Sequence, residues 1–194
     1  MPSAVSHRRG EYVRQAVLAA AFDELTENGV AGSTVAGVAR RCGVHETTIY
    51  RRWVTRENLL VDAMLARSAE AIPAPDTGST RGDLLAIAHA AIAYLTSPGG
   101  SAALHGAVLS VEDDYTEARQ AFWSGRYDAL APVVERGVAR GDLRAGTDAR
   151  LLLEMLWAPL HGRLLLTGEP IHDDLPERLV DLLLDGAAAH PRDP

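Results

Sequence analysis

The sequence has no lysine, only one cysteine and few aromatic residues, and all nineteen of its basic residues are arginine. A single cysteine excludes an intramolecular disulfide and a cysteine-rich metal site. The longest apolar stretches, near residues 151–160 and 179–189, are interrupted by charge, proline or glycine and are too broken to span a bilayer. No apolar run follows a basic N-terminal stretch, as it does in a signal peptide. We therefore expect a cytoplasmic protein that has no membrane partner.

Motifs typical of enzymes are also missing. The sequence has no G-x-S-x-G, no P-loop and no H-E-x-x-H. Its seven histidines are scattered, and no pair of them shows the spacing of metal ligands. We therefore expect no enzyme activity, no cofactor and no metal. A metal-dependent helical enzyme that uses His89, His105 or His161 remains the weakest alternative.

Apolar residues recur at helical spacing along the whole chain, and no useful run alternates with the period of a strand. The sequence therefore predicts an all-α protein. The segment Pro73–Gly78 is the clearest break. Helices are expected over about 57–71, 84–95, 101–110, 113–139 (with a kink or junction at Pro132), 147–167 (kinked at Pro159) and 175–190.

Residues 34–60 predict two short helices joined by a glycine turn and followed by a third helix. Apolar residues at i, i+3, i+4 and i+7 define one face of the first of these helices, at Val35, Val38, Ala39 and Cys42. Ser33 and Thr34 can cap its start, and Gly43 can end it. Ile49 and Trp53 would anchor the second helix to the core. This is the layout of a helix-turn-helix DNA reader.

The other residues of the second helix are polar or cationic: His45, Glu46, Thr47, Thr48, Tyr50, Arg51 and Arg52. A short helix with one anchored and one polar face suits the major groove of DNA. On spacing alone, an ordinary surface helix hairpin remains open. The distribution of charge favours a DNA-binding helix-turn-helix, although the whole chain has a net charge of −7. Residues 1–68 hold nine arginines against seven acids, and a cluster of five arginines lies within the motif, at Arg40, Arg41, Arg51, Arg52 and Arg56.

An upstream helix extends the pattern. Its apolar face is Leu18, Ala21, Phe22 and Leu25, and it is expected to stop at Asn28-Gly29. The segment from about Arg14 to Leu60 resembles the DNA-binding domain of the TetR family of bacterial repressors. The matching residues are Val17-Leu18, Ala20-Ala21-Phe22, Glu27-Asn28-Gly29, Thr34-Val35, Val38-Ala39, Gly43-Val44, Thr48-Ile49-Tyr50 and Arg56-Glu57-Asn58-Leu59-Leu60. Two residues depart from the family pattern, since it commonly has Ser in place of His45 and Phe in place of Trp53.

The resemblance implies two domains: a three-helix helix-turn-helix DNA-binding domain over residues 1–58, and a larger helical effector-binding and dimerisation domain over residues 59–194. It also implies double-stranded operator DNA as the partner. Chemistry and the resemblance together assign phosphate contacts to Thr34, Thr48, Tyr50, Arg52 and Arg56, and base contacts to His45, Glu46, Thr47 and Arg51. Arg8 and Arg9, in a polar N-terminal arm, are expected to add backbone or minor-groove contacts unless the arm is disordered.

The last two predicted helices carry more apolar surface than one side of a small domain needs. This surface is made by Leu151, Leu152, Leu153, Met155, Leu156 and Trp157 on the first helix and Leu179, Leu182, Leu183, Gly186 and Ala187 on the second. Burial within a monomer remains open from the residues alone. The resemblance implies a homodimer paired through these two helices, which would read a palindromic operator.

The resemblance further implies that a small molecule enters the larger domain and releases the protein from DNA, as in a repressor. Residues from about 130 to 186, including Arg140-Gly141-Asp142-Leu143-Arg144, look like one subgroup of TetR effector domains. The candidate pocket residues are His89, Tyr94, His105, Phe122, Trp123, Tyr127, Trp157, His161 and Arg163. Core packing is the competing role for each, and Arg163 could instead pair with an acidic side chain. A DNA-binding regulator with no small-molecule ligand, either partner-responsive or architectural, is the main alternative.

Overall fold

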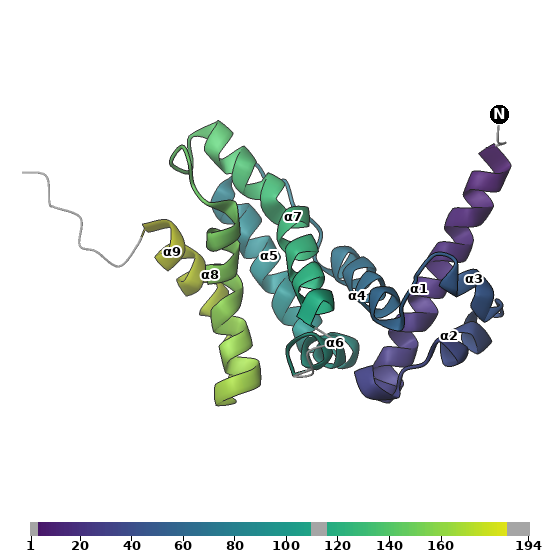
Figure 1. Ribbon diagram of the computed structural model, residues 1–194. Coiled ribbons are helices and arrows are strands. Elements are labelled where there is room, and N and C mark those ends of the chain that lie inside the picture. Colours follow the sequence, from purple (N-terminus) through teal and green to yellow (C-terminus); the bar gives the residue numbers. More distant parts are fainter. Residues whose placement is uncertain (1–3, 110–115, 186–194) are drawn as a thin grey trace, which may run out of the picture. The chain divides into compact units, whose positions relative to one another are not determined.

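The computed structural model describes residues 4–109 and 116–185, and within these ranges the secondary structure is helical, with no strand. This confirms the predicted all-α fold (Figure 1). The elements are α1 (Ala4–Gly32), α2 (Val35–Cys42), α3 (Glu46–Tyr50), α4 (Arg56–Ala71), α5 (Thr80–Leu95), α6 (Pro98–Leu109), α7 (Thr116–Arg140), α8 (Ala149–His161), the π-helical segment η2 (Gly162–Thr167) and α9 (Leu175–Asp185). No helix in these ranges is both long and apolar enough to cross a membrane.

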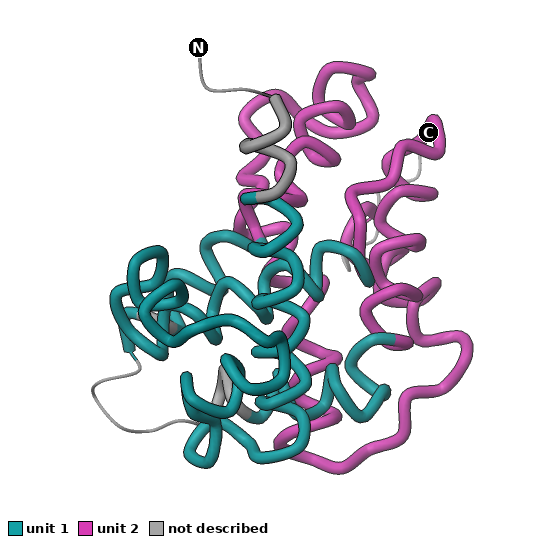
Figure 2. The backbone as a smooth tube through the Cα atoms, turned by 90° about the vertical axis from the view of Figure 1, so that its right-hand side faces the viewer, with its two compact units in different colours: residues 1–71, 94–126 teal, residues 72–93, 127–194 magenta. Residues whose placement is uncertain are grey.

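The chain folds into two compact units, one of residues 1–71 and 94–126 and the other of residues 72–93 and 127–194 (Figure 2). The boundary between the units falls inside α5 and inside α7, so each of these helices contributes to both. The predicted division of the chain into functional domains at residue 58 stays a prediction.

The first unit is built around α1. Its predicted apolar face is buried, with Leu25 fully so, and packs with residues of α2, α3 and α4 in one hydrophobic cluster. Gly29 leaves the helical conformation at φ 67° and ψ 176°, as expected for the end of this helix, and a further helical turn then extends to Gly32. The Ser33 backbone N–H and hydroxyl both donate to the Gly29 carbonyl, at 3.1 and 2.6 Å, and so close the break.

Helix α2 has the predicted caps. The Thr34 hydroxyl oxygen accepts a hydrogen bond of 3.0 Å from the Gly37 N–H, and Gly43 ends the helix with a left-handed φ of 69°. Cys42, on the apolar face, is half-buried, and its Sγ lies 3.1 Å from the Val38 carbonyl. Ile49 and Trp53, the predicted anchors of the second reader helix, are 1% and 5% exposed.

Helices α5 and α6 both begin earlier than the sequence predicts, and α6 does so across an expected break. Pro98-Gly99-Gly100 was expected to separate two helices, but it forms the first turn of α6. Proline tolerates the first turn of a helix because its missing N–H would have no helical acceptor there. The Ser97 hydroxyl takes the cap position and accepts from the Gly100 N–H at 3.1 Å.

The second unit has its own core, in which Leu84, Leu130, Val133, Leu153 and Leu160 are fully buried. Helix α7 continues through Pro132, and α8 continues through Pro159 and then changes to the π-helical η2 at Gly162. The Gly168 N–H donates to the Arg163 carbonyl five residues earlier, at 2.9 Å, which is the register of a π-helix.

A polar corner joins α5 to the end of α7 within this unit. The Asp142 carboxylate accepts from the Thr80 N–H and hydroxyl at 3.0 and 2.9 Å. Arg140 donates to Asp142 at 3.1 Å and to the fully buried Asp83 at 3.3 Å. The Arg140-Gly141-Asp142 segment therefore forms a hydrogen-bonded turn after α7, in which Gly141 has a φ of 82°.

Candidate nucleic-acid interface

Helix α3 is short and is held by its neighbours. Its N-terminal residue, His45, makes no side-chain cap hydrogen bond, and only its carbonyl engages the helix, through the Thr48 N–H at 2.9 Å. The start of α3 therefore lacks the side-chain cap that a serine at this position could supply. Because Ile49 and Trp53 are buried, the remaining face of α3 is directed outward.

The outward face of α3 contains the predicted DNA contacts. His45, Glu46, Thr47, Tyr50, Arg51 and Arg52 are exposed, and Thr48 is half-buried. Arg52 lies over the Trp53 ring, with its guanidinium carbon 5.6 Å from the ring centroid, so the buried anchor also orients a cation. The structure therefore gathers the candidate base contacts and most of the candidate phosphate contacts on one short element.

Two predicted phosphate contacts also have roles within the fold. Thr34 is exposed and caps α2 through its hydroxyl oxygen, which leaves the hydroxyl proton free to be donated elsewhere. Arg56 Nη1 donates to the carbonyls of Val30 and Ser33, at 3.2 and 3.1 Å, and its Nε donates to Glu57. Arg56 thus fastens the start of α4 to the α1–α2 connection, a role that sequence reasoning missed because its partners are 23 and 26 residues away.

The predicted cationic cluster needs a correction at Arg41. Its Nε lies 2.6 Å from the Glu24 carboxylate, which is buried, and its other nitrogens bond to Glu27. These bonds raise the pKa of Arg41, with Glu27 the larger cause. An alanine Cβ at Gly37 would lie 2.0 Å from a Glu24 oxygen, so the lack of a side chain there makes room for the carboxylate. Arg41 clamps α2 to α1, and the local positive field comes mainly from Arg40, Arg51 and Arg52.

The predicted N-terminal arm is helical in the structure, since α1 begins at Ala4. Arg8 and Arg9 are therefore part of a helix and not of an extended arm. The side chains of Arg8 and Arg9 are not among those that the structure describes, so their predicted DNA contacts stay predictions.

Comparison with known proteins decides the family. A family model described as "Bacterial regulatory proteins, tetR family" matches residues 17–63, and one described as "Tetracyclin repressor-like, C-terminal domain" matches residues 74–183. The second match alone spans more than half of the chain. The chain belongs to the TetR family.

Similar proteins match most of the chain. The chain is 36% identical over 179 residues to the transcriptional regulator AqdR of Rhodococcus erythropolis, a match that covers 92% of this chain and 86% of AqdR. It is 31% identical over 191 residues to YdeS of Bacillus subtilis, covering 97% and 96% of the two chains. The crystal structure of the TetR family transcription regulator SCO0332 superposes with a TM-score of 0.76 at 34% identity, covering 91% of this chain and 99% of that one. The protein is thus a DNA-binding transcriptional regulator and not an enzyme.

In this TetR-family regulator the candidate effector residues divide between the two units. The first unit holds Tyr94, His105, Phe122 and Trp123, and the second holds His89, Tyr127, Trp157, His161 and Arg163. Within the first unit, Phe122 and Trp123 meet edge to face at 5.0 Å. Within the second, Trp157 and His161 stack at 5.7 Å. A single pocket made of all nine residues stays a prediction.

Several of these residues have protein partners. His89 is exposed and lies 3.3 Å from Glu177. His105 is also exposed, and its Nδ1 lies 2.7 Å from the Ser101 carbonyl. The Arg163 side chain reaches Glu169 and the Pro170 carbonyl, each at 3.0 Å, so it pairs with an acidic side chain, as the sequence allowed. Tyr127 lies beneath Arg150, whose guanidinium is 5.1 Å from its ring centroid.

Other candidate effector residues have polar atoms that are buried. The Tyr94 hydroxyl and the Trp157 indole nitrogen are buried with no hydrogen-bond partner among the described residues. Burial raises the pKa of Tyr94 to about 12, and the charges of Arg67 and Arg126 only partly oppose this rise. Burial also lowers the pKa of His161 to about 4, so its imidazole is neutral at physiological pH. Buried polar groups of this kind are suited to hold a ligand by hydrogen bonds.

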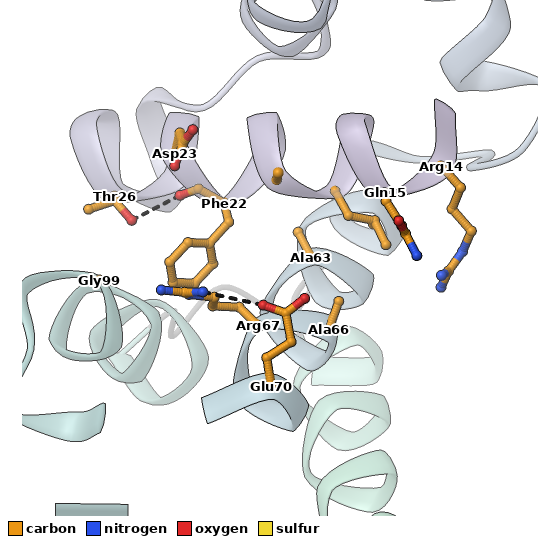
Figure 3. Close-up of a pocket in the computed structure, with 12 residues that line it drawn as sticks. Arg14, Gln15, Phe22, Asp23, Thr26, Ala63, Ala66, Arg67, Glu70 and Gly99 are labelled. Atoms are coloured by element: carbon orange, nitrogen blue, oxygen red, sulfur yellow. Dashed lines mark hydrogen bonds and ion pairs between the residues drawn. The ribbon is translucent and has the colours of Figure 1, made fainter. Parts of the chain in front are cut away.

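The structure also contains a hollow of about 460 Å³ between α1 and α4, which none of the nine candidates lines (Figure 3). Figure 3 shows Arg14 and Gln15 at one end and Phe22 with Arg67 and Glu70 at the other. Arg67 lies 5.9 Å from the Phe22 ring centroid and forms an ion pair of 3.2 Å with Glu70. Small residues such as Ala63, Ala66 and Gly99 leave this space open, and they carried no chemical signal in the sequence.

Proposed function

We propose that the protein is a homodimeric repressor that binds a palindromic operator and is released from it by a small molecule. The observation that carries the proposal is helix α3, which is anchored by Ile49 and Trp53 and presents a polar, cationic face to solvent. An α-helix of this kind fits the major groove. The base contacts of the proposal are His45, Glu46, Thr47 and Arg51, and its phosphate contacts include Thr34, Thr48, Tyr50 and Arg52. Arg56, which also bonds to the α1–α2 connection, is a further phosphate contact of the proposal.

Dimerisation is supported by apolar side chains that the chain itself leaves uncovered. On α8, Leu151 and Met155 are 53% and 51% exposed, although Leu153 and Leu156 on the same helix are buried. On α9, Leu182 is 54% exposed. Two neighbouring helices that each have a buried and an exposed apolar face need a partner surface. A second copy of the same two helices supplies one with two-fold symmetry.

The two-fold symmetry has a consequence for the operator. In a dimer, two copies of α3 would read two half-sites related by inversion. Half-sites read from one face of the duplex lie about 34–36 Å apart, or a multiple of that spacing. A single α3 of five residues contacts few bases, so the pair supplies specificity that one copy lacks.

Repression and release by an effector are the finer part of the proposal. Among similar proteins, a DNA-binding transcriptional repressor TetR of Mycobacteroides abscessus is 30% identical over 181 residues, and the match covers 91% of this chain and 94% of that protein. The Tyr94 hydroxyl, which is buried in the first unit, is a polar group that a ligand could satisfy. A molecule that favours the DNA-free conformation would shift the population away from the operator by its difference in affinity for the two states.

The test begins with selection of operator DNA from a random pool by the purified full-length protein. The proposal expects an inverted repeat, bound with at least about a thousandfold preference over unrelated DNA. Fluorescence anisotropy of labelled operator would then follow release by fractionated metabolite extracts, with thermal shift of the free protein as the second readout. An operator without an inverted repeat would refute binding by a two-fold symmetric dimer. Specific binding that no fraction reverses would favour a regulator with no small-molecule ligand.

A further inference from the structure

A second hollow, of about 510 Å³, runs between the N-terminal half of α1 and the end of α3, and we call it the α1–α3 groove. Its walls come from two elements that are far apart in the sequence and close in the fold. The lining residues are Gly10, Val13, Arg14 and Val17 from α1, and Thr48, Arg51, Arg52 and Trp53 from α3 and the turn after it. The groove thus adjoins the outward face of α3 and adds a wall from α1.

The charge of the groove has one sign. Three of its lining residues, Arg14, Arg51 and Arg52, are cationic, and none is acidic. Among the described residues, Arg51 and Arg52 have no ion pair with a carboxylate, whereas Arg14 has a 3.4 Å contact with Glu11. This contrasts with Arg41 and Arg56, whose guanidinium groups bond to neighbouring acids. The groove therefore keeps positive charge that the fold does not neutralise, and it is complementary to an anion.

The floor of the groove is apolar. Val17 and Trp53 are almost fully buried, and Val13 is half-buried beside them. Thr48 adds a half-buried hydroxyl next to the cations, and a hydroxyl donates well to a phosphate oxygen. A cationic rim over an apolar floor matches a phosphodiester, in which a charged phosphate adjoins the largely apolar face of a deoxyribose.

We infer that the α1–α3 groove holds one phosphodiester of the DNA backbone, gripped by Arg14 from α1 and by Thr48 and Arg51 from α3. The inference rests on the proposed function, because it requires DNA to lie against α3. It adds Arg14, to which no sequence pattern assigned a DNA role. It also moves Arg51 from the predicted base contacts to the phosphate contacts and leaves the base edges to His45, Glu46 and Thr47.

Contacts to one phosphate from two helices fix the orientation of the protein on DNA, which a single contact does not. A phosphate held by α3 alone fixes the distance of that helix from the backbone but leaves its rotation about the contact free. Bonds from α1 and α3 to one phosphate fix the orientation of both helices on the duplex. Backbone contacts of this kind set the register in which base contacts are read.

Arg14→Gln is the direct test, because glutamine keeps a polar side chain of similar reach and removes the charge. Affinities of the variant and the wild type for the selected operator and for unrelated duplex DNA would be measured across a salt series. We expect the slope of log K against log salt to become shallower by about 0.9, the value for one lost phosphate contact. Affinity should fall by a similar factor on both DNAs, because a phosphate contact carries no sequence information.

Three further variants complete the test. Arg67→Gln removes an exposed arginine of α4 that lies outside the groove, so its slope should match that of the wild type. Arg14→Lys should retain the slope, because it keeps the charge. Arg51→Gln should lower the slope without changing the preferred bases, as scored by selection from random DNA. Thermal melting of each variant would show that the fold is intact.

An unchanged slope for Arg14→Gln, in a protein that melts like the wild type, would overturn the inference. So would a changed base preference for Arg51→Gln, which would return Arg51 to the base contacts. Inorganic phosphate, titrated against the operator complex at constant ionic strength, separates the sources of the anion. Displacement of DNA at micromolar phosphate would assign the groove to a free phosphate and not to the backbone. A wild-type protein that binds no duplex DNA would instead refute the proposed function itself.

Discussion

The indole nitrogen of Trp53 donates a hydrogen bond of 2.9 Å to a carboxylate oxygen of Asp62. Trp53 follows α3, and Asp62 lies on α4, so the bond ties the end of the reader helix to the helix after it. A phenylalanine, which the family commonly has at this position, could not make this bond. The departure at Trp53 therefore brings a polar partner as well as a larger anchor.

Trp53→Phe should keep an apolar anchor and lose the bond to Asp62. We expect a loss of about 1–2 kcal/mol in the free energy of unfolding, because the half-buried carboxylate loses its donor. Urea denaturation measures this loss. Asp62→Ala and the double variant complete a mutant cycle, which should give a coupling energy that favours the wild-type pair. Additive losses would show that the bond contributes nothing beyond packing.

Gly100→Ala should destabilise the first unit. An alanine Cβ would lie 1.9 Å from the Tyr94 carbonyl oxygen, and this oxygen is backbone that cannot rotate away. Relief requires the start of α6 to shift, at a cost of about 1–3 kcal/mol or more. Gly10→Ala is the matched control, because nothing lies within 4 Å of its added Cβ. Thermal melting should separate the two variants, and equal melting temperatures would contradict the close approach at Gly100.

Stability should fall in acid partly through Asp83. Burial alone would raise its pKa, but hydrogen bonds from the Thr77 N–H and hydroxyl and from Arg140 outweigh burial and lower the pKa below its ordinary value. The unfolded chain then binds the proton more readily than the folded one. The contribution of Asp83 is therefore complete above the ordinary Asp pKa of about 4, and it is lost as the pH falls towards the lower folded value.

Asp83→Asn should reveal this contribution. At pH 7 the variant should be less stable by about 1–3 kcal/mol, because a charged acceptor of several hydrogen bonds is lost. The difference from the wild type should shrink as the pH falls below about 4, where the wild-type carboxylate loses its advantage. Urea denaturation at a series of pH values measures both curves. Thr77→Val, which keeps the backbone N–H and removes the hydroxyl, should give an intermediate curve, and parallel curves would contradict the assignment.

Charges placed on the exposed apolar face of α8 and α9 should separate the proposed dimer. Leu151→Glu together with Leu182→Glu adds like charges to a surface that is expected to meet its own copy. Sedimentation velocity should show a monomer, and operator affinity should fall about 100-fold or more, because the two readers are no longer linked. Tyr12→Ser, at an exposed aromatic residue of α1, is the control and should leave the sedimentation unchanged. A double variant that remains dimeric would locate the interface elsewhere.

The sequence predicted local structure well, and the reason is visible at Ile49 and Trp53. Their spacing of four residues reports which side of a helix is buried, and no distant residue is needed to read it. The caps Thr34 and Gly43 are equally local. Local rules mislead at Pro98, because a proline predicts a break, although the first turn of a helix accepts one.

Roles that depend on distant partners could not be read from spacing. Arg41 and Arg56 belong to a cationic cluster in the sequence, yet their guanidinium groups bond to α1 and to the connection after it. The same limit applies to Arg14, which reaches the α1–α3 groove only through the fold. The candidate effector residues share aromatic or polar chemistry, and chemical type alone does not place side chains in one cavity.

The shortness of α3 bears on how stable the proposed recognition surface is. A helix of five residues with no side-chain cap has no independent stability, since an isolated helix must be far longer before it persists in water. Its shape depends on Ile49 and Trp53 resting in the core of the first unit. A small displacement of either anchor would therefore unwind the recognition surface instead of tilting it as a rigid rod. Local opening of α3 should therefore be frequent, detectable as rapid amide hydrogen exchange at Thr48 and Arg51.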